Sequence, residues 1–137
     1  MIVVDASVVF KWIRDEEDFH DIAQSIYRKI ITNQLKIIGP DFLNIEITNV
    51  IVTKSSIDSK LISELLQDFL ALPIKYIPIT PSLLKVSAML AKKYKTSVYD
   101  MLYAVIAKRN KCKLITADRK FIEKTKFSHV IHISEYK

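Results

Sequence analysis

Glycine and cysteine are almost absent from this chain of 137 residues, which contains one of each. The single glycine, Gly39, excludes the dinucleotide-binding fingerprint G-x-G-x-x-G and the phosphate-binding loop G-x-x-x-x-G-K, because both need several glycines for backbone to approach phosphate. The single cysteine, Cys112, excludes an intramolecular disulfide and a C-x-x-C zinc half-site, and its apolar and basic neighbours predict a half-buried structural thiol. We therefore expect no nucleotide cofactor and a reducing, cytoplasmic compartment.

Long hydrophobic runs are also missing. No run approaches the roughly 18 apolar residues of a membrane span, and Asp5 stands where a secretory leader has basic residues. Half of the residues are nevertheless hydrophobic and the mean hydropathy is +0.16, so the chain can bury a sizeable core. These features predict one globular domain, residues 1–137, with no membrane partner.

Positive charge is concentrated in one part of the sequence. The formal net charge is +6, but residues 1–84 sum to −3 and residues 85–126 sum to +9. We call residues 85–126 the basic block. Such a block suits a polyanionic partner, although a solvated lysine-rich face explains it equally well.

Short β-branched runs alternate with longer segments of helical period. This rhythm predicts an α/β fold with a mostly parallel sheet covered on both faces. The expected strands are 2–4, 35–38, 74–79, 113–115 and 130–133. The expected helices are 8–13, 19–32, 41–54, 58–70, 81–94, 98–109 and 119–125, with N-terminal caps at Asp58, Thr80 and Ser97.

Two of the expected strands end in a carboxylate and a hydroxyl. The first strand is followed by Asp5 and Ser7, and the fourth by Thr116 and Asp118. Ligands of doubly wound folds bind beyond the carboxyl ends of the strands, so these residues are candidates for a binding site. Helix capping is the competing interpretation of each acid taken alone.

The segment 41–55 places polar residues on two opposite faces of a helix. Asn44 and Thr48 fall on one face, as expected of a solvent-facing stripe, whereas Glu46 and Asn49 fall on the other. The second polar face must contact something polar inside the protein, such as a water-filled pocket or a metal ion. Glu46 and Asn49 are therefore predicted to point into a site.

The segment 98–107 is apolar or tyrosine apart from Asp100. A capping box with Ser97 explains an acid at this position. The face of the helix that carries Asp100 also carries Ala104 and Ala107, whose small side chains allow close approach to a neighbouring strand. Both roles are compatible, so we expect this carboxylate to lie near the sheet.

Together, Asp5, Glu46, Asp100 and Asp118 predict a metal site. Carboxylates gathered without counter-charge raise one another's pKa and destabilise the fold, whereas two divalent cations neutralise them. Oxygen ligands without cysteine or convergent histidine select Mg²⁺ or Mn²⁺. Such ions support in-line displacement at a phosphodiester, and an acidic metal site in a basic chain is what a nuclease requires.

Other catalytic arrangements find little support in the sequence. His129 and His132 are three apart in one expected strand, so they face opposite sides and cannot chelate one metal. His20 lies in an acidic helix start, and all three histidines are assigned packing or surface roles. The chain has no G-x-S-x-G motif, so serine hydrolase chemistry is not expected.

Four motifs carry a family resemblance. They are V-V-D-A-S-V, P-D-F-L-N-I-E-I-T-N-V, S-V-Y-D-M-L-Y-A-V-I-A and L-I-T-A-D-R-K-F. With these four motifs in this order, the chain resembles a PIN-domain ribonuclease, and within that family it resembles the VapC-type toxins of toxin–antitoxin pairs. The resemblance implies metal-ligating and catalytic acids at Asp5, Glu46, Asp100 and Asp118, supported by Ser7, Asn49 and Thr116. Met101 departs from the small residue that the family often has there.

The resemblance also implies a fold and an activity. The fold is a three-layer α/β/α sandwich with a five-stranded sheet of order 3-2-1-4-5, which places the first and fourth strands side by side. The activity is endonucleolytic RNA cleavage dependent on Mg²⁺ or Mn²⁺, in a homodimer bound by an antitoxin. A catalytically silent PIN-like module that binds RNA or a partner is the alternative. A phospho-acceptor receiver domain fits less well, because the third strand ends in I-P-I-T-P, without an acid.

Two further predictions concern the surface. Helices 19–32 and 58–70 carry apolar residues at positions expected to be exposed, among them Ile26, Ile57 and Leu61, which favours a homodimer. RNA is expected to contact the basic block through phosphates, which carry no sequence information. The expected contacts are Lys108, Arg109, Lys111 and Arg119, with Lys11 and Arg14 as secondary contacts near Asp5.

Overall fold

A single five-stranded sheet forms the centre of the molecule. The computed structural model describes residues 1–14, 16–54 and 57–137. The strands are β1 (Ile2–Val4), β2 (Ile37–Pro40), β3 (Ile74–Ile77), β4 (Lys113–Thr116) and β5 (Val130–His132). Their order is β3-β2-β1-β4-β5 and their four pairings are all parallel, which confirms the predicted order. Strand β1 is central, with Val3 opposite Ile38 on one side and Leu114 on the other.

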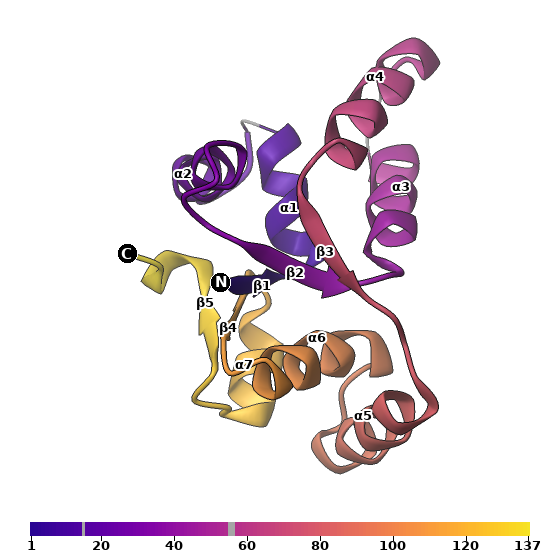
Figure 1. The fold of residues 1–137 in the computed structure, drawn as a ribbon, viewed down its shortest axis with the longest axis vertical. Helices are drawn as coiled ribbons and strands as arrows, with labels where there is room; N and C mark the ends of the chain where they lie inside the picture. Colours follow the sequence, from indigo (N-terminus) through magenta and orange to yellow (C-terminus); the bar gives the residue numbers. More distant parts are fainter. Residues whose placement is uncertain (15, 55–56) are drawn as a thin grey trace.

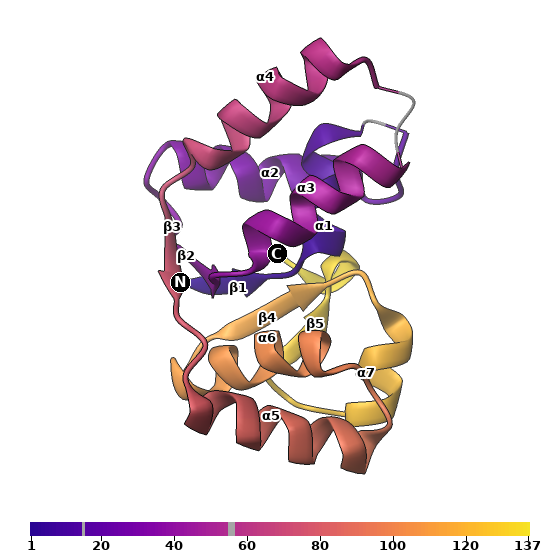
Figure 2. The same ribbon diagram turned by 90° about the vertical axis from the view of Figure 1, so that its right-hand side faces the viewer.

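Helices cover both faces of the sheet, as Figures 1 and 2 show. On one face lie α1 (Ala6–Ile13), α2 (His20–Ile31), α3 (Leu43–Lys54) and α4 (Ser59–Leu70). On the other lie α5 (Pro81–Tyr94), α6 (Val98–Arg109) and α7 (Arg119–Thr125), and a short 3₁₀ turn (Ile133–Glu135) follows β5. The predicted three-layer α/β/α sandwich is confirmed. None of the described helices is long and apolar enough to cross a membrane.

The core explains why the elements pack as they do. Helix α6 is buried without interruption from Met101 to Ala107, so it forms the centre of its layer. Helix α3 buries Leu43, Ile47 and Ile51, which recur at the i, i+4, i+8 spacing of one helical face. A buried helix has little room for charge, and the acid of α6 accordingly lies in its first turn, at the edge of the core.

Most element boundaries agree with the prediction, and the differences have local causes. Strand β2 begins two residues late because the N–H groups of Gln34 and Leu35 donate to the Lys29 carbonyl and close the end of α2. Helix α3 begins at Leu43 because Asp41 bonds to the chain that follows β3, at Ile79 N (3.3 Å). The predicted caps Asp58, Thr80 and Ser97 are confirmed by hydrogen bonds to the first turns of their helices.

The histidines and the cysteine have packing roles. His20 Nδ1 lies 2.8 Å from the Lys11 carbonyl oxygen, and His132 Nδ1 lies 2.7 Å from Ser134 Oγ. His129 belongs to the turn before β5 rather than to the strand, and its Nε2 lies 3.0 Å from the Ala104 carbonyl oxygen. Cys112 is a half-buried free thiol, as predicted.

The surface prediction for the apolar helices is partly wrong. Ile26 is fully buried in the core, because α2 turns this face towards the sheet. Ile57 is half-buried, whereas Leu61 on α4 is 45% exposed as predicted. The large apolar side chains with the highest exposed fractions lie elsewhere, on α3 and α5, where Ile45 is 72% and Met89 75% exposed.

Several turns use left-handed backbone without glycine. Lys95 ends α5 with φ of 53° and Lys126 ends α7 with φ of 51°. Lys111, in the turn after α6, has φ of 53°. Glycine adopts this conformation without strain, whereas a residue with a Cβ does not. Three lysines therefore occupy positions that the backbone alone assigns to glycine.

We expect Lys126→Gly to stabilise the protein by about 0.5 to 1 kcal/mol, because it removes the Cβ strain at the end of α7. Lys124→Gly is the matched control. This residue lies inside α7, where glycine should destabilise by about 1 kcal/mol. Urea unfolding of both variants checks the sign, and equal losses of stability in the two would contradict the interpretation.

Candidate active site

The first candidate residue, Asp5, follows the central strand directly. Its carboxylate caps α1 by accepting hydrogen bonds from Ser7 N (3.0 Å) and Val8 N (3.3 Å), and it also accepts from Ser7 Oγ. Burial raises the pKa of Asp5 to about 6, although hydrogen bonds from Ser7, Thr116 and Val8 N oppose the rise, and the charge of Asp100 adds to it. Asp5 is therefore both a cap and a carboxylate that the fold holds at an energetic cost.

The end of β4 lies beside the end of β1 and is tied to it. The Ala117 N–H donates to Ser7 Oγ at 3.0 Å, so one hydroxyl joins the two strand ends. Asp118 N donates to the buried Thr116 Oγ at 3.0 Å, and Asp118 Oδ1 caps α7 by accepting from Phe121 N. The structure therefore confirms that the two strand ends adjoin.

Glu46 enters the site from the first turn of α3. Its carboxylate is half-buried and accepts a hydrogen bond from the Tyr103 hydroxyl of α6. Burial raises the pKa of Glu46, the bond from Tyr103 opposes this, and the charges of Asp5 and Asp100 add to it. Burial and the nearby Glu46 charge in turn raise the pKa of Tyr103, so its hydroxyl stays protonated and donates.

The predicted inward polar face of α3 holds for Glu46 but not for Asn49, which is exposed. The core face of the helix is rotated from the one expected, so Ile45 and Asn49 share an exposed side. Asn44, expected in solvent, is half-buried and accepts a 2.6 Å hydrogen bond from Tyr76. A supporting role for Asn49 stays a prediction.

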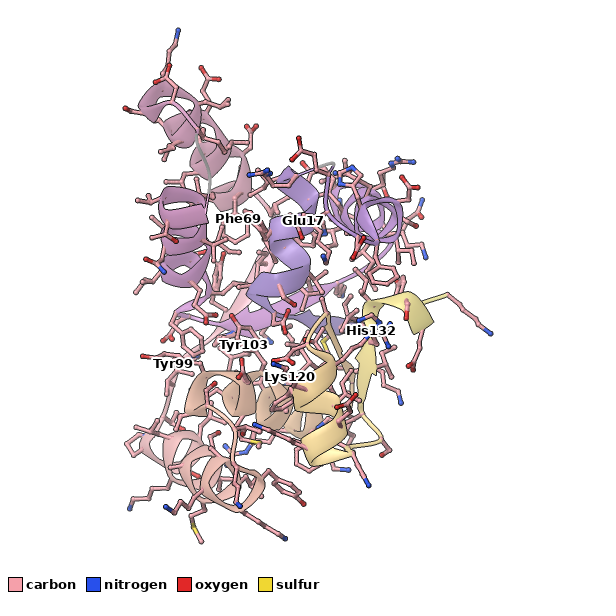
Figure 3. The ribbon with its side chains drawn as sticks, turned by 180° about the vertical axis from the view of Figure 1, so that it is seen from behind. Glu17, Phe69, Tyr99, Tyr103, Lys120 and His132 are labelled. Atoms are coloured by element: carbon pink, nitrogen blue, oxygen red, sulfur yellow. The ribbon has the colours of Figure 1, made fainter. Side chains whose placement is uncertain are left out.

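Asp100 lies at the start of α6, where Ser97 caps the helix. The Ser97 hydroxyl accepts from Asp100 N (3.0 Å) and donates to Asp100 Oδ2 (2.6 Å). Asp100 and Asp118 line a common cavity of about 180 Å³. Three lysines share its lining, and they are Lys95, Lys120 and Lys124. In Figure 3, Tyr99, Tyr103 and Lys120 are labelled from left to right below α3, with Tyr99 at the left edge of the molecule.

The four acids form no ion pair with any cation that the structure describes. The ion pairs formed by described residues are Lys11 with Glu17 (3.1 Å) and Arg14 with Glu16 (2.9 Å), and neither involves the four acids. The all-oxygen donor set fits Mg²⁺ or Mn²⁺, and Asp5, Glu46 and Asp100 lie close enough for their charges to interact. Within the described residues, however, no three acidic, histidine or cysteine side chains are grouped so that they could hold a metal ion. The four acids therefore fit such an ion in their donor chemistry rather than in their grouping among the described residues.

Two features of the neighbourhood differ from the sequence analysis. Lys11, a predicted secondary RNA contact, is only 7% exposed, and its ammonium pairs with Glu17 at 3.1 Å. It is therefore not a free surface cation. Tyr103 was not predicted as a site residue, although its position three residues after Asp100 in an otherwise apolar helix places it on the face of that acid.

Solved structures with the same fold include PAE2754 from Pyrobaculum aerophilum, with 22% identity and a TM-score of 0.70 over 97% of this chain and 90% of that one. A toxin–antitoxin complex from Klebsiella pneumoniae shows 16% identity and a TM-score of 0.65 over 99% and 100% of the two chains. The toxin VapC20 from Mycobacterium tuberculosis, described as cleaving the Sarcin-Ricin loop, shows 12% identity and a TM-score of 0.69 over 90% and 94%. These similarities establish the fold.

A comparison with curated proteins gives no match. The family model described as PIN domain matches residues 2–127. This range contains all four motifs of the site, from the end of β1 to the start of α7. The chain therefore belongs to the PIN domain family.

Proposed function

We propose that this protein is a metal-dependent endoribonuclease and the toxin of a toxin–antitoxin pair. The observation that carries the proposal is that Asp5, Glu46 and Asp100, from three different elements, lie within range of one another's charge, and that none of them forms an ion pair with a described cation. Membership of the PIN domain family supports a nuclease. The fold shared with VapC20 and with the toxin–antitoxin complex supports the toxin assignment.

In this proposal, Asp5, Glu46, Asp100 and Asp118 hold Mg²⁺ or Mn²⁺. When bound, the ions supply an activated water and stabilise charge on the scissile phosphate. Ser7 and Thr116 keep the acids in place, because the Ser7 hydroxyl bonds to Asp5 and the Thr116 hydroxyl holds the backbone of Asp118. The lysines that line the cavity of Asp100 and Asp118 are then placed to meet phosphates of the RNA.

The direct test is cleavage of end-labelled single-stranded RNA with Mg²⁺, with Mn²⁺ and with a chelator. We expect internal cuts that require the metal, and none in single-stranded DNA of the same sequence. RNA binding without cleavage under any of these conditions would favour the alternative, a catalytically silent PIN-like module. An RNA substrate and an antitoxin would both place the protein in the cytoplasm.

The proposed homodimer rests on exposed apolar side chains of α3 and α5. Ile45, Val52 and Met89 are 72%, 56% and 75% exposed, and such side chains favour a protein partner. We expect sedimentation at micromolar concentration to give twice the 15.8 kDa chain mass. Ile45→Asp should shift the protein to monomer, whereas Ile31→Asp, on α2, should not. A parent protein that sediments as a monomer would leave an antitoxin as the partner of this surface.

A further inference from the structure

Tyr103 connects the two helical layers at the acidic site. It lies on α6, is 1% exposed, and its hydroxyl donates to Oε2 of Glu46 on α3. The two residues are 57 positions apart in the sequence. A buried tyrosine hydroxyl requires a polar partner, and here that partner is one of the four predicted acids. The contact therefore sets the distance between an acid of one layer and the helix that carries an acid of the other.

The aromatic ring of Tyr103 is held from the side of α3. Phe42 packs edge-to-face against Tyr103, with centroids 5.5 Å apart, and makes the same contact with Tyr99. Phe42 lies in the turn just before α3, where its carbonyl accepts a hydrogen bond from Glu46 N (3.1 Å), whereas Tyr99 and Tyr103 are four residues apart on one face of α6. The hydroxyl is thus presented by a packed ring on a buried helix, which is a more precise support than a loop provides.

A carboxylate has two oxygens, and the Tyr103 bond occupies one of them. We propose that Tyr103 is a positioning residue that fixes Oε2 of Glu46 and presents Oε1 to the divalent ion of the site. The inference rests on the proposed function and extends it. Asp100 is three residues before Tyr103 on the same helix, so the same contact holds the spacing between Glu46 and Asp100.

The test compares Tyr103→Phe with Tyr76→Phe. The first variant keeps the ring and its packing on Phe42 but removes the hydroxyl from Glu46. The second removes the other tyrosine hydroxyl that bonds to α3, at Asn44 (2.6 Å), away from the acids. Calorimetric titration with MnCl₂ measures the affinity directly, without RNA. Loss of an outer-shell partner weakens metal binding about 10- to 100-fold, so we expect a Kd for Tyr103→Phe about 10-fold above the parent value and no change for Tyr76→Phe.

A second measurement separates positioning from simple packing. The shielded hydroxyl proton of Tyr103 should give a downfield proton NMR signal that is lost in Tyr103→Phe and in Glu46→Ala. We expect the signal to shift but persist when Mg²⁺ is added, because Oε2 keeps its bond while the ion binds. Parent-like Mn²⁺ affinity in Tyr103→Phe, or loss of the signal on Mg²⁺ binding, would overturn the positioning role while leaving the nuclease proposal intact. A parent protein that binds no Mn²⁺ would instead overturn both.

Discussion

Asp5→Asn is expected to abolish RNA cleavage and, without metal, to stabilise the fold at neutral pH. Asparagine retains the Oδ1 acceptor that Ser7 N and Val8 N use to cap α1, but it removes the charge that would bind the ion. Loss of a mere outer-shell partner reduces metal affinity or activity by about 10- to 100-fold, so loss of a direct ligand should exceed about 100-fold. Cleavage at the parental rate would show that Asp5 is only a helix cap.

The stability effect has a defined pH dependence. The pKa of Asp5 rises from 3.8 to about 6 in the folded chain, so between these values the folded state binds more protons than the unfolded state. The free energy of unfolding of the parent therefore falls as pH increases through this window and remains lower above it. Asparagine does not titrate, and the variant should gain about 2 to 3 kcal/mol over the parent by pH 7 to 8.

Urea unfolding in a chelator at pH 4 to 8 measures this difference. The two curves should converge at pH 4, apart from a constant offset, separate between pH 4 and 6, and keep a constant difference above that. Saturating Mn²⁺ should reverse the order, because ligand binding stabilises only the protein that can bind it. Asp58→Asn is the control, since Asp58 caps α4 on the exposed surface and should change neither cleavage nor the pH dependence.

Neutralising Lys108, Arg109, Lys111 and Arg119 together is expected to weaken RNA binding for every sequence. All four side chains are exposed, and each lost phosphate contact removes roughly 0.7 from the salt slope of single-strand binding. The full set should therefore lower the slope by roughly 3. A variant that neutralises Arg28, Lys36, Lys60 and Lys75, which are exposed outside the basic block, has the same charge change and serves as control.

Cations of the basic block lie near both ends of α6. Asp100 lies at its start, whereas Lys108 and Arg109 lie in its last turn, roughly 12 Å away at 1.5 Å per residue. The cavity beside Asp100 is instead lined by Lys95, Lys120 and Lys124. Neutralising these three should affect short oligonucleotides, while neutralising Lys108, Arg109 and Lys111 should matter only for longer RNA. Parental affinity and salt dependence in the set of four would show that this part of the block is a solvated face.

The sequence was most informative where geometry follows from topology. Parallel strands bring their carboxyl ends to one edge, so the strand pattern placed Asp5 and Asp118 at the same edge of the sheet, and the family resemblance placed their strands side by side. Helix periodicity was less informative, because it separates faces without saying how a helix is rotated against its neighbours. That rotation buries Ile26 and Lys11 and exposes Asn49. Tyr103 was missed because its partner, Glu46, comes from another layer of the fold.

At the three lysines with left-handed backbone, the stability of the fold and the positive charge of the surface favour different residues. Lys95, Lys111 and Lys126 all belong to the basic block, and each holds a cation where glycine would relieve strain of about 1 kcal/mol. Glycine at all three positions would stabilise the fold, but it would also remove three positive charges from the surface that attracts polyanions. Selection for heat resistance and selection for RNA binding would therefore favour opposite residues at these turns, and variants recovered under each condition should separate at these three positions.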